Sequence, residues 1–433
     1  MKRFLMLSGL WAIGYGTRVM AADASSAPGV PPAAEPPASH QPESYMRVRS
    51  PEAGVRIIET ATRTFHPANG PGPDIRLVGV THIGEAAYYT AIQQTLDTST
   101  LVLFEGVGRP DFVTQSPDTP EDRAAWTQSA ADYVADLYRW HKESQEAWPA
   151  DMAALAAVVR AKRNREFPWV ARAERDGWGR PWSLDLEATP ARIGSLGSDG
   201  APGGDGTARD LWADIPAPDD ASSGLRDIQS SIADALGLRY QLDAIRYDRA
   251  HFRNSDMTLG QIRSAMAGGI GTGQEQQVMR MLEGAPEMGP MMQGLVRMIS
   301  ASPQIRATVR AMMIDALGAS EDLLQHSASG AGPMGRLMKV LIADRNQVVL
   351  EDLRRALESD PHVKSVALFY GAGHMADLEI FLVEDMNYRP SGTDWLPAFG
   401  VRLADTGMTE SQWEGLRSIL HAQMRQGMLS NPP

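Results

Sequence analysis

The sequence has no cysteine in 433 residues, and basic side chains are outnumbered by acidic ones. Disulfides, thiol chemistry and Cys-ligated zinc are therefore excluded. Lys and Arg number 41 against 53 Asp and Glu, which gives a net charge of −12 without any long basic cluster. Proteins that follow nucleic-acid phosphates usually carry a basic surface. We therefore expect no nucleic-acid partner.

Long apolar runs are also scarce, and the clearest one lies at the start of the chain. Residues 4–16 follow Lys2 and Arg3, and small residues come just after them. This run of about 13 residues is shorter than the roughly 20 that cross a bilayer. The pattern is typical of a cleaved secretory signal, which we place at residues 1–21. We expect a periplasmic or secreted protein with no stable membrane insertion after cleavage.

Composition divides the rest of the chain. Residues 22–48 are rich in Ala, Pro and Ser, which predicts a disordered linker, and residues 49–433 are expected to fold. Within that domain, residues 188–224 predict a flexible loop, and residues 225–333 a helical insertion or lid. The Met-rich stripes of the insertion have core packing as their default role. A flexible, thioether-lined cover over an apolar substrate is the sharper alternative.

Two junctions of the same kind stand almost three hundred residues apart. A short apolar strand at residues 75–78 leads into Gly79-Val80-Thr81-His82, and a longer one at residues 365–370 leads into Gly371-Ala372-Gly373-His374. A helical pattern follows each of them. Open α/β sheets bind their ligands at such strand-to-helix switches. We therefore predict an α/β fold with a mixed, mainly parallel sheet, and one site built from both junctions.

Two charged residues are expected at the same edge of the sheet. Glu105 follows the apolar run at residues 101–104, as the residue after a buried parallel strand would. Arg345 falls on the apolar face of the helix predicted at residues 334–357. A buried guanidinium is costly without an anion, so either a structural carboxylate or a functional site lies near it.

Two imidazoles and a carboxylate are a common ligand set for divalent metals. We predict that His82, His374 and Glu105 hold a metal ion such as Mn, Co or Zn. Glu105 has either a ligand or a base role, and Arg345 would stabilise an oxyanion or hold a substrate carboxylate. Further candidates for substrate binding are Asn346, Asp256 and Glu187.

Four motifs, in this order, resemble the signatures of the TraB/Tiki family, which includes PrgY and GumN-type proteins: Gly79-Val80-Thr81-His82, Phe104-Glu105-Gly106, Asp344-Arg345-Asn346 and Gly371-Ala372-Gly373-His374. The resemblance covers about residues 55–110 and 334–400 and makes residues 49–433 a TraB/Tiki-like domain. It implies an α/β core of two related halves and, for the Tiki branch, an Mn- or Co-dependent protease. Asp344 stands where a glutamate is expected.

The leading hypothesis is thus an exported metal-dependent hydrolase, a peptidase acting on a peptide or protein substrate. The alternative is a non-catalytic periplasmic binding protein that captures a peptide, lipid or haem-like ligand at the same edge. A third hypothesis, a surface scaffold held by the linker, is weaker than both, because it does not explain why polar residues such as Arg345 face inwards.

Overall fold

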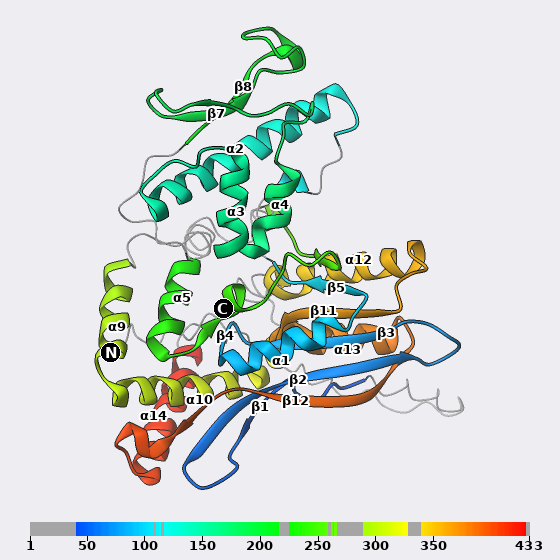
Figure 1. Ribbon diagram of the computed structural model, residues 1–433. Coiled ribbons are helices and arrows are strands. Elements are labelled where there is room, and N and C mark those ends of the chain that lie inside the picture. Colours follow the sequence, from blue (N-terminus) through cyan, green and yellow to red (C-terminus); the bar gives the residue numbers. More distant parts are fainter. Residues whose placement is uncertain are drawn as a thin grey trace, which may run out of the picture.

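The computed structural model describes residues 40–106, 110–113, 117–215, 225–258, 261–262, 264–265, 289–327 and 339–429. The predicted signal, residues 1–21, and the linker up to residue 39 lie outside this part. A central sheet carries helices around it, and a second layered region stands beyond one end (Figure 1).

The central sheet has seven strands in the order β1-β2-β3-β11-β5-β10, with β12 also pairing with β2. The half formed by β3, β11, β5 and β10 is parallel, and the pairs of β2 with β1, β3 and β12 are antiparallel. The bounds are β1 Met46–Arg49, β2 Val55–Pro67, β3 Asp74–Val80, β5 Leu101–Phe104, β10 Phe252–Asn254, β11 Ser365–Gly371 and β12 Tyr388–Arg402. The predicted α/β class with a mixed sheet is confirmed.

The two inner parallel strands, β5 and β11, are almost wholly apolar because helices cover them. All four residues of β5 and six of the seven in β11 are buried. The buried faces of α1 (Ala86–Asp97), α12 (Arg345–Ser359) and α13 (Met375–Glu384) belong to the same core. Side chains of five more helices belong to this core or pack against it: α5 (Leu225–Leu236), α6 (Gln241–Ala244), α9 (Gly289–Ala301), α10 (Pro303–Ser327) and α14 (Glu410–Leu429). A separate two-stranded pairing joins β4 (Ile83–Gly84) to β9 (Arg239–Tyr240).

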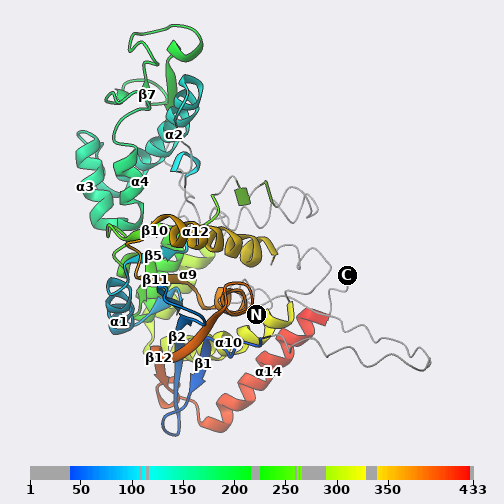
Figure 2. The same ribbon diagram turned by 90° about the vertical axis from the view of Figure 1, so that its right-hand side faces the viewer.

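A second apolar core holds the region beyond the sheet together. It comprises α2 (Pro120–Gln145), α3 (Met152–Lys162), α4 (Phe167–Arg172) and a sheet of β6 (Ser183–Asp185), β7 (Arg192–Ser195) and β8 (Leu211–Asp214). Short 3-10 turns at Asp111–Val113, Asn164–Glu166 and Gly206–Ala208 connect these elements. Figure 2 shows this region projecting past the central sheet from a second side. We call it the α2–β8 module.

The flexible loop predicted at residues 188–224 is wrong for its first part. Strands β7 and β8 lie inside it and pair with each other, and residues 216–224 lie outside the described part. The strands form because Ile193 and Ala213 are buried against the aromatic face of α2. Each of these strands has only four residues, and a Gly-rich segment lies between them. The alternation of apolar and polar residues is therefore too short to be recognised in the sequence.

Two other boundaries need correction. The linker predicted to run to residue 48 ends earlier, since β1 pairs with β2 and the buried Tyr45 hydroxyl donates a 2.6 Å hydrogen bond to Glu379. The insertion predicted at residues 225–333 is not only helical, because β10 pairs with β5 in the central sheet. Both segments find their partners far away in sequence, which local patterns do not reveal.

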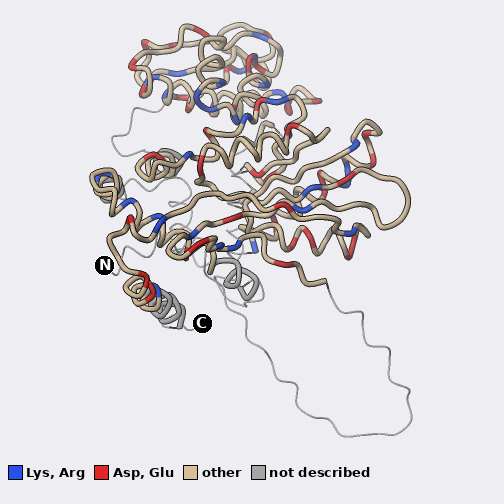
Figure 3. The backbone as a smooth tube through the Cα atoms, turned by 60° about the horizontal axis from the view of Figure 1, so that its bottom comes forward, with Lys and Arg blue, Asp and Glu red and all other residues tan. Residues whose placement is uncertain are grey.

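Acidic and basic positions are interspersed over the described backbone (Figure 3), in line with the absence of a basic cluster in the sequence. Among the described residues, no helix is both long and apolar enough to span a bilayer.

Candidate functional site

Both Gly-x-x-His junctions lie where the sequence predicts a strand-to-helix switch. β3 ends at Val80, and α1 begins four residues after His82. β11 ends at Gly371 and passes through the turn Ala372–His374 directly into α13. Close packing explains a glycine here, because a Cβ on Gly79 would lie 3.1 Å from the Ala61 carbonyl oxygen. Since β3, β11 and β5 are parallel neighbours, their carboxyl ends share one edge.

Arg345 is the centre of a buried charged cluster at that edge. It stands at the first position of α12, after the π-helical turn Lys339–Asp344, and is 5% exposed. Its Nε and Nη2 donate to the two carboxylate oxygens of Asp256 at 2.8 and 2.7 Å, and Nη2 also donates to Glu105. The sequence predicts an anion near this arginine, and the structure places two carboxylates there, those of Asp256 and Glu105.

Backbone amides hold the two carboxylates in place. Glu105 Oε2 accepts a 2.7 Å bond from the Gly371 amide, and Asp256 accepts from the amides of Gly106 and Met257 at 2.9 and 2.7 Å. With two carboxylates and one guanidinium, the cluster carries one net negative charge in a buried place. Such a charge favours the arrival of a cation.

The pKa values follow from this arrangement. Burial works against the charged form of Glu105, yet Arg345, His374 and His82 together hold its pKa well below the usual range. Burial also opposes the charged form of Arg345, but Asp256 and Glu105 raise its pKa. Both groups are therefore charged at neutral pH.

His374 is neutral and oriented. Its Nδ1 donates to Asn346 Oδ1 at 2.8 Å, and the same amide donates from Nδ2 to the His374 carbonyl oxygen at 3.3 Å. The Nε2 atom lies 3.4 Å from Arg345 Nη1 and 3.7 Å from Glu105 Oε1. A guanidinium can only donate, so Nε2 carries the lone pair. Burial, reinforced by Arg345, lowers the pKa of His374 to about 4 despite the nearby carboxylates.

His82 has the same kind of support from another part of the chain. Its Nδ1 lies 2.9 Å from Gln241 Oε1, and the Gln241 amide nitrogen donates to the Tyr247 hydroxyl at 3.0 Å. This fixes the amide so that its oxygen faces the imidazole, which places the His82 lone pair on Nε2. His82 lies close enough to Glu105 and His374 that a proton on its imidazole would lower the pKa of both groups. His82 is half-buried, whereas His374 is 4% exposed.

The further predicted residues divide into three cases. Asp256 is fully buried and is the main partner of Arg345, although the sequence offered it only for substrate binding. Asn346 orients His374. Glu187 is exposed in the α2–β8 module and makes none of the cluster's contacts. The sequence analysis missed Gln241, which is 159 residues from His82 and belongs to no motif.

The donor atoms suit a divalent ion in kind. Two imidazole lone pairs and a carboxylate oxygen are nitrogen and oxygen donors of the type that Zn, Mn and Co accept. Each imidazole also has a hydrogen-bond acceptor on Nδ1, as metal-bound histidines usually do, although here the acceptor is a side-chain amide oxygen. In the arrangement described, however, no three His, Asp or Glu side chains among the described residues are grouped around one point where an ion would fit. The donor atoms are therefore of the right chemical type for a divalent ion, but in this arrangement the carboxylates of Glu105 and Asp256 are hydrogen-bonded to Arg345.

Comparison with known proteins gives no relative. No family model matches the sequence, no curated protein matches it, and no solved structure matches the fold.

Proposed function

We propose that this chain is an exported metal-dependent hydrolase that acts on peptide bonds, with His82, His374 and Glu105 as the ligands of a divalent ion. The observation that carries the proposal is the pair of histidines at one edge, each with Nδ1 on an oriented amide oxygen, beside a buried cluster with net negative charge. The choice of a peptide substrate, of Mn or Co, and of export rests on the resemblance to the TraB/Tiki family and on the signal-like start of the sequence.

Ion binding need not leave Arg345 without a partner. Asp256 alone accepts two of its N–H groups, so Glu105 can turn from the guanidinium to a cation while the arginine stays paired. The second oxygen of Glu105 remains held by the Gly371 amide. With a divalent ion bound, the net charge of the cluster would change from −1 to +1, so the magnitude of the buried charge would not increase.

The side chains have separate tasks in the proposed reaction. A bound divalent ion would polarise a substrate carbonyl and make a water molecule acidic enough to attack it. Arg345, fixed by Asp256 and by the Leu341 carbonyl oxygen, would present to the developing oxyanion the Nη2 N–H group that Glu105 leaves. Glu105, once released from Arg345, would serve as a ligand of the ion while its second oxygen stays on the Gly371 amide. His374 stays neutral above pH of about 4, which keeps its lone pair available at physiological pH.

One experiment tests this function directly. The purified chain is incubated with a peptide library in Mn, Co or Zn, with and without a chelator, beside the His82→Ala and His374→Ala variants. Cleavage should depend on the metal and disappear in both variants. The exposed His362, which is outside the cluster, gives the matched control His362→Ala and should retain cleavage. Cleavage that survives the chelator and both variants would reject the proposal.

A second candidate is a non-catalytic binding protein. One observation favours it: the guanidinium of Arg345 engages both carboxylates in the structure, which is also what a purely structural ion cluster would do. In that case a peptide, lipid or haem-like ligand would bind at this edge with equal affinity in the presence of chelator, and no library peptide would be cut.

A further inference from the structure

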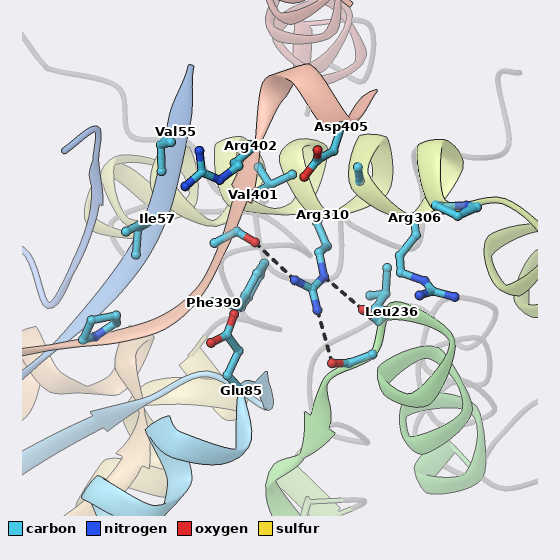
Figure 4. Close-up of a pocket in the computed structure, with 15 residues that line it drawn as sticks. Val55, Ile57, Glu85, Leu236, Arg306, Arg310, Phe399, Val401, Arg402 and Asp405 are labelled. Carbon is cyan, nitrogen blue, oxygen red and sulfur yellow. Dashed lines mark hydrogen bonds between the residues drawn. The ribbon is translucent and has the colours of Figure 1, made fainter. Parts of the chain in front are cut away.

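A second pocket lies apart from the Arg345 cluster, between α10, β12 and the C-terminal end of α5 (Figure 4). Its volume is about 740 Å³, within the range of small-molecule sites. None of its lining residues is Arg345 or a partner of Arg345. Apolar and charged side chains both line it, chiefly Leu236, Phe399, Val401, Arg306, Arg310 and Glu85.

Arg310 faces this pocket without a salt-bridge partner among the described residues. Its guanidinium donates to the carbonyl oxygens of Leu236, Gly237 and Gly400 at 2.9, 3.2 and 3.3 Å, the dashed contacts of Figure 4. These acceptors are neutral and use three of the five N–H groups that a guanidinium offers. Burial lowers the pKa of Arg310, the like charge of Arg306 adds to this, and Glu85 opposes it. An anion would relieve this cost.

Arg306 lies one helical turn before Arg310 on the same face of α10. Both side chains extend from the helix towards Leu236 in Figure 4. The Nε of Arg306 is buried and has no hydrogen-bond partner in the described part of the chain. Buried donors without partners are costly and uncommon in folded proteins. The acids of the pocket, Glu85 and Asp405, form no ion pair with either arginine within that same part.

Apolar side chains form the other wall of the pocket. Val55 and Ile57 are half-buried, and Pro303 and Pro397 are exposed, so these lining residues offer apolar surface to a ligand. A ligand that satisfies both walls has an anionic head for the arginines and an apolar body for this wall. Carboxylates suit the head, because their two oxygens match the paired N–H groups of a guanidinium.

We propose that this pocket binds a small carboxylate with an apolar body, through Arg306 and Arg310. The site is independent of the proposed hydrolase activity and of any metal, so the two proposals stand or fall separately. Arg310 also closes the end of α5 through its three carbonyl contacts. Within the described ranges Arg306 makes no such contact, which makes it the better position to change.

The test measures binding to the full chain by calorimetry with three probes: octanoate, acetate and 1-octanol. Octanoate should bind saturably, and acetate and 1-octanol at least about tenfold more weakly, because each lacks one half of the ligand. Failure of octanoate to saturate at millimolar concentration, or equal binding of octanoate and 1-octanol, would overturn the proposal.

Variants locate the binding site. Arg306→Gln should weaken octanoate binding about tenfold or more by removing a charged donor. Arg306→Lys keeps the positive charge but loses the paired N–H groups of the guanidinium, so its octanoate affinity should lie between those of the unaltered chain and Arg306→Gln. This variant also provides the test if Arg306→Gln does not fold. Arg389→Gln, the same substitution at an exposed arginine of β12 that does not line the pocket, is the control and should bind as the unaltered chain does. Unchanged binding in both Arg306 variants would contradict the assignment.

Discussion

The two Gly-x-x-His junctions share a motif but differ in their surroundings. His374 follows a seven-residue strand in the middle of the sheet, is buried, and touches the charged cluster through Arg345 and Glu105. His82 is half-buried and is held by Gln241, next to the short β4–β9 pairing. The comparison shows that the same motif can place one histidine, His374, in a buried and fully packed position and the other, His82, in a more accessible one. We therefore expect perturbations on the His374 side to cost more stability than those on the His82 side.

The largest effect should come from removing the centre of the His374 side. Arg345→Ala leaves Asp256 and Glu105 buried without their cation, which should lower the free energy of unfolding by about 3–5 kcal/mol. Urea denaturation measures this change. Arg402→Ala, at an arginine whose side chain is 70% exposed, should cost less than about 1 kcal/mol. A similar cost for the two variants would remove the distinction between a buried cluster and an ordinary surface pair.

Acid sensitivity is the next effect, and it belongs to His374. Its pKa in the folded chain is about 4, below that of an ordinary histidine, so the unfolded chain binds more protons between about pH 4 and 6.5. Stability is therefore complete above about pH 6.5 and falls as the pH drops towards 4, by up to about 3 kcal/mol. In metal-free buffer, His374→Asn should flatten this part of the profile. A His374 imidazole that titrates near 6.5 by NMR would contradict the account.

The amides that support the imidazoles allow a matched comparison of the two sides. Asn346→Leu and Gln241→Leu each leave an imidazole Nδ1–H without its acceptor, at a cost of about 1–3 kcal/mol where the group is buried. The cost should be larger for Asn346, because His374 is the more buried histidine. If these histidines bind metal, both variants should also weaken it about 10–100-fold. Calorimetric unfolding measures the loss of stability, and metal titration measures the loss of affinity. A larger loss of stability in Gln241→Leu than in Asn346→Leu would contradict the comparison.

The smallest effect is expected at Glu187. This exposed residue of the α2–β8 module makes no contact with the cluster, so Glu187→Gln should change stability by less than about 0.5 kcal/mol. Asp256→Asn, the corresponding substitution in the cluster, should be clearly destabilising in the same urea titration. Equal results would mean that Asp256 is not a principal partner of Arg345.

Much of this edge of the sheet could be predicted from local patterns. The apolar runs before Gly79, Glu105 and His374 mark parallel strands, and parallel neighbours end at one edge, so the approach of Glu105 to His374 follows from the sequence. Arg345 was predicted to need an anion because it falls on an apolar helix face. The short patterns were enough here because each junction has its own strand, turn and helix signals.

Other parts depend on contacts that no local pattern contains. β10 has three residues, too few for a periodicity, and yet it brings Asp256 under Arg345. Gln241 reaches His82 across 159 residues. β7 and β8 become strands because α2 offers them an apolar face. In each case the tertiary partner, rather than local propensity, decides the structure.

The most direct test of the central claim is X-ray absorption at the metal edge of the chain loaded with Co or Zn. The account predicts one ion per chain with two imidazole nitrogens in its first shell, and one imidazole after either His82→Ala or His374→Ala. A chain that binds no stoichiometric ion, or a ligand shell that neither substitution changes, would contradict it.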